Sequence, residues 1–123
     1  MGNPVVHFEI SGRDPQRLRD YYSNLFDWQF DTGSPVAPSI SEAGNYGFVS
    51  SESGIPGGVG GGADYPRQAI FYVGVDDVEA ALQTAEKLGG TRVLGPEANP
   101  NGQLVVAHFR DPEGNLIGLA GPR

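Results

Sequence analysis

The sequence contains no cysteine, which excludes disulfide bonds, thiolate nucleophiles and thiolate metal sites. It is also poor in basic residues, with 8 lysines and arginines against 15 acidic residues and a net charge of −7. Such a surface repels phosphate backbones and anionic lipid headgroups, so we expect no nucleic acid partner and no membrane partner. No apolar run approaches the roughly 20 residues that a membrane-spanning helix needs.

The first residues, "MGNPVVHFEI", lack the basic start and apolar core of a secretion signal, so we expect a cytoplasmic location. A length of 123 residues suits a single domain over 1–123. Nineteen glycines and ten prolines cluster at 33–62 and 89–102. They mark turns between periodic segments.

Two halves of the sequence share one order of elements. Residues 5–30 and 69–94 each read as a strand, a helix and a strand, and each half continues with two more strands. In the first half these are "YGFVS" and "IPGGV", with a turn at 51–54. The halves, about 1–60 and 66–123, therefore form two modules. Superposing them places His7 over Tyr72, Phe48 over His108, and Gly58 over Gly118.

Each expected helix has recognisable ends. Asp14 can cap the first helix and Pro15 suits its first position. Asp76 is the expected cap of the second helix, with Glu79 as its capping-box partner. Gly89 and Gly90 then stop that helix.

Alternation along a strand assigns side chains to two faces. We expect Val6, Phe8 and Ile10 to pack against the helices. The opposite face mixes polar and apolar side chains, which suits a cup for a small-molecule ligand. Its expected members are Val5, His7, Glu9, Ile70, Tyr72, Gly74, Leu104, Val106 and His108.

Several motifs together resemble one family. They are "HFEI" before a helix that ends in "FDWQF", then "GIPGG", "YVGVDDVEAALQTAEKLGG" and "FRDPEGNLIGLA". The chain resembles the vicinal oxygen chelate superfamily, which includes glyoxalase I, bleomycin-resistance proteins and extradiol dioxygenases. The resemblance implies an α+β fold in which two βαβββ modules form a curved mixed-sheet cup. It also implies a homodimer, which the exposed edge strands of open modules favour.

Metalloenzymes of that superfamily bind a divalent cation at four positions, which by resemblance are His7, Gly58, Tyr72 and Gly118 here. Only His7 is a good ligand, whereas a catalytic zinc usually keeps about three protein ligands. We therefore predict no metal and no other cofactor. Gly118 stands where related enzymes carry a glutamate, and we expect its missing side chain to enlarge the cup.

His7 and Glu9 are the candidate catalytic residues. His7 could act as a metal ligand, as a general base, or as a structural histidine held by the backbone or by Glu9. The candidate ligand-binding residues line the expected cup, although plain packing is an alternative for the tyrosines. They are Tyr46, Phe48, Ile70, Tyr72, Leu104, Val106 and His108.

The glycine-rich stretch 54–62 lacks the Lys-Ser/Thr ending of a phosphate-binding loop. We interpret it as a flexible bridge between modules, with a mobile flap over the cup as a second interpretation. Two functions remain open. The protein is either a binding module that sequesters an antibiotic or metabolite, or a metal-independent isomerase or lyase that uses His7 or Glu9 as a base. A metal-dependent glyoxalase is a third alternative, which needs further ligands from a partner chain or unexpected positions.

Overall fold

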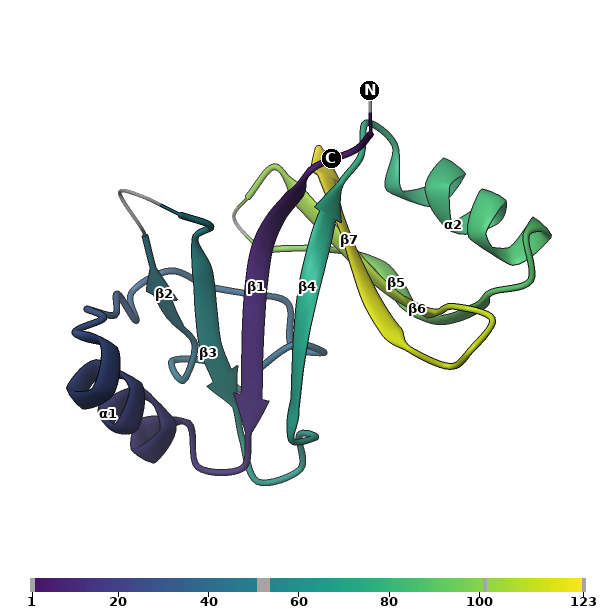
Figure 1. Cartoon of the computed structure of the whole chain (residues 1–123). Helices are drawn as coiled ribbons and strands as arrows, with labels where there is room; N and C mark the ends of the chain where they lie inside the picture. The colour runs from purple at the N-terminus through teal and green to yellow at the C-terminus, as the bar shows by residue number, and fades with distance from the viewer. Residues whose placement is uncertain (1, 51–53, 101, 123) are drawn as a thin grey trace. The chain divides into compact units, whose positions relative to one another are not determined.

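The computed structural model describes residues 2–50, 54–100 and 102–122. Along the chain it has α1 and α2 among seven strands, β1 to β7, so the predicted α+β class is confirmed (Figure 1). The chain divides into a first unit, residues 7–69, and a second unit, residues 1–6 with 70–123. The elements are β1 (Val5–Gly12), α1 (Pro15–Phe26), β2 (Gly47–Val49), β3 (Gly57–Gly61), β4 (Gln68–Gly74), α2 (Val78–Lys87), β5 (Thr91–Ala98), β6 (Leu104–Arg110) and β7 (Leu116–Pro122).

In the first unit, β3 lies between β2 and β1. It runs parallel to β1, with Glu9 opposite Gly58, and antiparallel to β2, with Phe48 opposite Gly58. The strand expected at 28–30 is absent, and only a single bridge between Asp31 and Phe48 forms near it. The three expected strands after α1 are therefore reduced to β2, β3 and this bridge among the described residues.

The glycine-rich stretch contains the strand expected at "IPGGV", shifted by two residues, and its interpretation as a flexible bridge was wrong for 57–61. Residues 57–61, "GGVGG", form β3, and all five are buried. Bulky side chains of neighbouring elements fill the space above these glycines, since a Cβ added at Gly57 would lie 2.2 Å from the Phe8 ring. The turn expected at 51–54 lies largely outside the described residues.

The second unit has the complete predicted order of strand, helix and three strands, with strand order β4-β7-β6-β5. Tyr72 of β4 lies opposite Gly118 of β7 in the parallel pair. His108 of β6 lies opposite the same glycine in the antiparallel pair. The helix-facing core of this unit comprises Val78, Leu82, Ala107 and Leu119.

Aspartates cap both helices, but the second cap differs from the prediction. Asp14 accepts a hydrogen bond from the Arg17 backbone N–H at 3.1 Å, as expected. For α2 the cap is Asp77, whose Oδ1 accepts the Ala80 backbone N–H at 3.0 Å, so the assignment to Asp76 was wrong. Gly89 follows the helix at a φ of 103° that favours glycine.

The strand registers also correct the superposition of the two halves. Gly58 and Gly118 are equivalent, as are Phe48 and His108, because each pair holds the same place in its antiparallel ladder. In the parallel ladders, however, the residue equivalent to Tyr72 is Glu9, and His7 therefore corresponds to Ile70. The predicted superposition of the parallel strands was therefore shifted by two residues. A shift of two residues leaves every side chain on the same face of the sheet, so strand alternation cannot detect it.

Among the residues that the structure describes, no helix is long and apolar enough to cross a membrane.

Candidate functional site

A network of three polar side chains lies within the first unit. The Tyr46 hydroxyl donates a hydrogen bond to Glu9 Oε2 at 2.9 Å. The same hydroxyl is 3.1 Å from His7 Nε2. Glu9 is 5% exposed and Tyr46 is 3% exposed, whereas His7 is half-buried. An imidazole and a carboxylate are thus joined through one hydroxyl group.

The strand geometry explains why these side chains meet. His7 and Glu9 are two residues apart in β1, so they point to the same face. Tyr46 stands just before β2, and its ring lies over β3. A Cβ added at Gly58 would be 2.2 Å from that ring, and one at Gly60 would be 2.5 Å from it. These glycines therefore provide the space in which the tyrosine reaches both residues of β1.

Burial sets the protonation of His7. It lowers the pKa of the imidazole below its ordinary value of 6.5, so the ring is neutral at pH 7. The Tyr46 hydroxyl has one proton, which it donates to a Glu9 carboxylate. His7 Nε2 must then donate to the tyrosine oxygen, which leaves the lone pair of the neutral ring on Nδ1. In this state Nδ1 is the basic atom of the imidazole.

Phe48 adds an aromatic wall to the network. Its ring centroid lies 4.7 Å from that of Tyr46 and 6.3 Å from that of His7. Four predicted site residues, namely His7, Glu9, Tyr46 and Phe48, are therefore brought together in the first unit.

The second unit contains a related pair. The Tyr72 hydroxyl lies 2.8 Å from His108 Nε2, and the two residues are only 1% and 5% exposed. Burial lowers the pKa of His108 to about 4, so this imidazole is also neutral at pH 7. Strand alternation placed both residues on one face, but the pairing that sets them on either side of Gly118 is a long-range property.

The space above Gly118 is filled by Tyr72. A Cβ added at Gly118 would lie 2.4 Å from Tyr72 Cδ2. The expectation that this glycine enlarges a cup was therefore wrong, because its missing side chain admits a tyrosine ring.

The other predicted ligand-binding residues differ in their exposure to solvent. Ile70 and Val106 are buried, at 5% and 7% exposure, whereas Leu104 is 42% exposed near the start of β6.

The side chains at the superfamily's metal positions do not suit a divalent cation. Gly58 and Gly118 have no side-chain donor atoms, and tyrosine rings occupy the space where a side chain would lie. The corrected register puts Ile70 in place of Tyr72 as the counterpart of His7, and isoleucine is no ligand either. Within 2–50, 54–100 and 102–122, no group of three or more His, Cys, Asp or Glu side chains is placed to hold a metal ion.

Comparison with known proteins identifies the family. The family model described as Glyoxalase/Bleomycin resistance protein/Dioxygenase superfamily matches residues 5–119. The chain belongs to this superfamily. A glyoxylase-like domain-containing protein of Didymella fabae is 31% identical, with 90% of this chain and 91% of the relative covered. The predicted resemblance is thereby confirmed.

Solved structures of other proteins share the fold. A hypothetical protein of Bacillus halodurans C-125 has a TM-score of 0.72 at 15% identity, covering 100% of this chain and 96% of the other. Methylmalonyl-CoA epimerase of Mycobacterium tuberculosis has a TM-score of 0.70 at 12% identity, covering 97% and 87%. At these identities the likeness concerns the fold alone.

Proposed function

We propose that this superfamily member binds a small organic molecule beside the network of His7, Tyr46 and Glu9, without a divalent metal. The observation that carries the proposal is the Tyr46 hydroxyl, which holds an imidazole and a carboxylate at 3.1 and 2.9 Å. It does so above Gly58, where superfamily metalloenzymes have a ligand by resemblance. Polar groups of the protein thus replace the cation as the feature that orients a ligand.

The chemistry of the network favours a ligand that donates hydrogen bonds. A carboxylate accepts only, and a neutral imidazole can accept at Nδ1. The net charge of −7 further attracts cations. We therefore favour a cationic antibiotic or amine metabolite, sequestered without turnover. The candidate contacts are Tyr46 and Phe48, which lie beside His7 in the first unit.

The metal-free part of the proposal is tested by elemental analysis of dialysed protein. We expect no divalent ion in stoichiometric amount, and no change in melting temperature when Zn²⁺, Ni²⁺ or a chelator is added. One tightly held ion per chain would overturn the proposal.

The ligand is sought with a thermal-shift screen of cationic antibiotics, amines and small oxo-acids. A ligand at a hundred times its Kd adds roughly 2.7 kcal/mol to the stability of the folded state. Tyr46→Phe should weaken binding of a hit, whereas Tyr72→Phe, which removes the matching hydroxyl of the second unit, is the control for a general loss of stability. Equal binding to wild type and Tyr46→Phe would exclude the network as the site.

The network also favours an enzyme as the second candidate function. An imidazole and a carboxylate that share a hydroxyl can pass a proton between them, as an isomerase or lyase requires. His7 or Glu9 would abstract a proton next to a carbonyl group. Exchange of that proton for deuterium in D2O, followed by NMR for oxo-acids and thioesters, measures this step. Exchange that persists in both His7→Ala and Glu9→Gln would eliminate this candidate.

The homodimer remains part of the proposal. Superfamily resemblance supports it, and analytical ultracentrifugation across a concentration series measures it. A single species with the mass of one chain, 13.0 kDa, at all concentrations would rule it out.

A further inference from the structure

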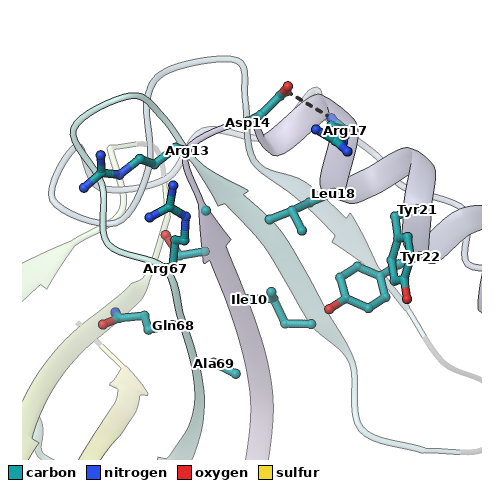
Figure 2. A pocket seen from close by; sticks show the side chains of 12 residues that line it. Ile10, Arg13, Asp14, Arg17, Leu18, Tyr21, Tyr22, Arg67, Gln68 and Ala69 are labelled. Carbon is teal, nitrogen blue, oxygen red and sulfur yellow. Dashed lines mark hydrogen bonds between the residues drawn. The ribbon is translucent and has the colours of Figure 1, made fainter.

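A cavity of about 530 Å³ lies on the helix-covered face of the first unit. Its size falls within the roughly 300–1,000 Å³ of small-molecule sites. It is lined by the end of β1, the first half of α1 and residues 67–69 (Figure 2). Ile10 lines it, and Ile10 points away from the face of Glu9 because the two are neighbours in β1. The cavity is therefore separate from the network of His7, Tyr46 and Glu9.

The cavity has an apolar wall. Ile10 comes from β1, and Leu18 and Tyr22 lie one turn apart on α1. Leu18 packs closely against the end of β1, since a Cβ added at Gly12 would lie 2.5 Å from Leu18 Cδ1. In the view of Figure 2, Ile10 and Leu18 lie between the tyrosines on one side and two arginines on the other.

The charged lining is unusual for so acidic a chain. Arg13, Arg17 and Arg67 line the cavity, and they are three of the seven arginines in a sequence of net charge −7. The carboxylate among the lining residues is that of Asp14, which caps α1 by accepting the Arg17 backbone N–H.

Three arginines elsewhere have partners within the protein. Arg19 donates to the Asn45 carbonyl, Arg92 forms ion pairs with Glu79 and Glu86, and Arg110 donates to the Gly114 carbonyl. Within the described part of the chain, no hydrogen bond or ion pair engages the guanidinium groups of the cavity. Their donors thus remain available to a ligand at an apolar surface.

We propose that this cavity binds an amphipathic carboxylate, that is, an aryl or medium-chain aliphatic acid. Its carboxylate would be held by Arg13 and Arg67, because the planar fork of an arginine matches a carboxylate with two parallel hydrogen bonds. Its apolar body would lie on Ile10, Leu18 and Tyr22. This site goes beyond the proposed function, which uses the other face of β1 and favours a cation.

The test is a titration of the whole chain with 4-phenylbutanoate and octanoate, followed by calorimetry and by NMR shifts of backbone amides. The corresponding alcohols serve as neutral probes. We expect saturable binding of the acids, with shifts confined to the residues around the cavity, and binding of the alcohols at least about tenfold weaker.

Variants then assign the contacts. Arg13→Ala and Arg67→Ala should each weaken binding of the acids about tenfold. Lys87→Ala removes an exposed positive charge from α2 and should leave binding unchanged, so it controls for net charge. Ala69→Phe, at an exposed position of the lining, should block the cavity while the fold is kept.

Three outcomes would overturn the proposal: no saturable binding of either acid, equal binding of acids and alcohols, or equal losses in the arginine variants and Lys87→Ala. Loss of acid binding in Glu9→Gln, with full binding in Arg67→Ala, would instead place the ligand at the network. Since the cationic ligand of the proposed function is tested with different probes, the two proposals fail independently.

Discussion

The two units contain the same packing arrangement, but the tyrosine and the histidine come from exchanged strands. In each, a glycine in the last strand is covered by a tyrosine ring whose hydroxyl lies against a histidine. In the second unit the tyrosine comes from the parallel neighbour β4 and the histidine from the antiparallel neighbour β6. In the first unit the histidine is on the parallel neighbour β1, and Tyr46 precedes the antiparallel neighbour β2.

The difference between the units lies in charge and exposure. The first unit adds the Glu9 carboxylate to the hydroxyl and leaves His7 half-buried. In the second unit Tyr72 and His108 are both at most 5% exposed. The Gly–Tyr–His contact, which both units share, is therefore a packing arrangement. A buried carboxylate with a partly accessible imidazole makes the first unit the better candidate for a functional site.

The largest expected effect on stability comes from adding a methyl group at Gly118. Gly118→Ala puts a methyl group 2.4 Å from the ring of Tyr72, which is 1% exposed. We expect a loss of about 3 kcal/mol in the free energy of unfolding, the upper part of the range for overpacked cores. Urea denaturation measures it. Gly102→Ala is the control, since its added methyl would meet nothing closer than 3.4 Å, and it should cost under about 0.5 kcal/mol.

A double-mutant cycle shows whether the tyrosine causes this loss. In a Tyr72→Ala background, the cost of Gly118→Ala should fall below about 1 kcal/mol because the clashing ring is gone. Equal costs in both backgrounds would mean that the backbone, and not Tyr72, requires the glycine.

The next effect is a dependence of stability on pH that arises mainly from the second unit. The folded pKa of His108 is about 4, against an ordinary value near 6.5, so the unfolded state binds the proton first. The stability that the neutral state of His108 contributes should therefore be complete above pH 6.5, decline as the pH falls to 4 and change little below it, by on the order of 2–3 kcal/mol. Denaturant titrations at a series of pH values measure this decline.

Single histidine variants show how much each unit contributes to the dependence of stability on pH. The chain has only two histidines, and the pKa of His7 is lowered in the same direction. His108→Gln should flatten most of the slope, and His7→Gln a smaller part. A hydrogen bond from Arg92 holds the pKa of Glu79 at about 2, so the contribution of Glu79 is lost only as the pH falls below its ordinary value of 4.5. An unchanged slope in His108→Gln would show that His108 is not buried as a neutral base.

Removing the two hydroxyl groups should affect the units unequally. Tyr46→Phe removes a hydroxyl with two partners, Glu9 at 2.9 Å and His7 at 3.1 Å, and each hydrogen bond contributes about 1 kcal/mol. Tyr72→Phe removes a bond to a neutral imidazole, worth about 1 kcal/mol. Thermal unfolding at pH 7 compares them. A larger loss in Tyr72→Phe would contradict the role of the Tyr46 hydroxyl as a bridge between two side chains of the first unit.

The sequence predicted much of the fold because its signals were local. Asp14 followed by Pro15 marked the start of α1, and period-two alternation assigned His7 and Glu9 to one face. The strand at 28–30 was predicted from an apolar run that follows the first helix, and this run includes Trp28 and Phe30. In the structure these rings pack on one another instead, with Trp28 at 5.2 Å from Phe8 and 5.1 Å from Phe26. Aromatic content does not distinguish a strand from such a cluster.

The site was predicted only in part because it depends on register. Tyr46, His7 and Glu9 were each identified, but the hydrogen bonds that join them follow from the pairing of Glu9 with Gly58. That pairing joins residues far apart in the sequence, and a two-residue shift in it leaves every side chain on the same face of the sheet. The cavity with three arginines was missed because Arg13 and Arg67 are far apart in the sequence and belong to no motif.

The smallest expected effect tests the helix caps of the two units. Asp14→Ala and Asp77→Ala should each cost about 1 kcal/mol, because each removes a carboxylate that accepts a backbone N–H of the first turn, at 3.1 and 3.0 Å. Asp76→Ala is the matched control: it removes the same charge one residue earlier without removing the capping bond, so its cost should stay under about 0.5 kcal/mol. If Asp76→Ala proved as costly as Asp77→Ala, the start of α2 would shift by one residue. Asp14 and Asp77 each lie five residues after the corresponding strand residues, Glu9 and Tyr72. With the cap at Asp76, the helix caps would no longer support that correspondence between the units.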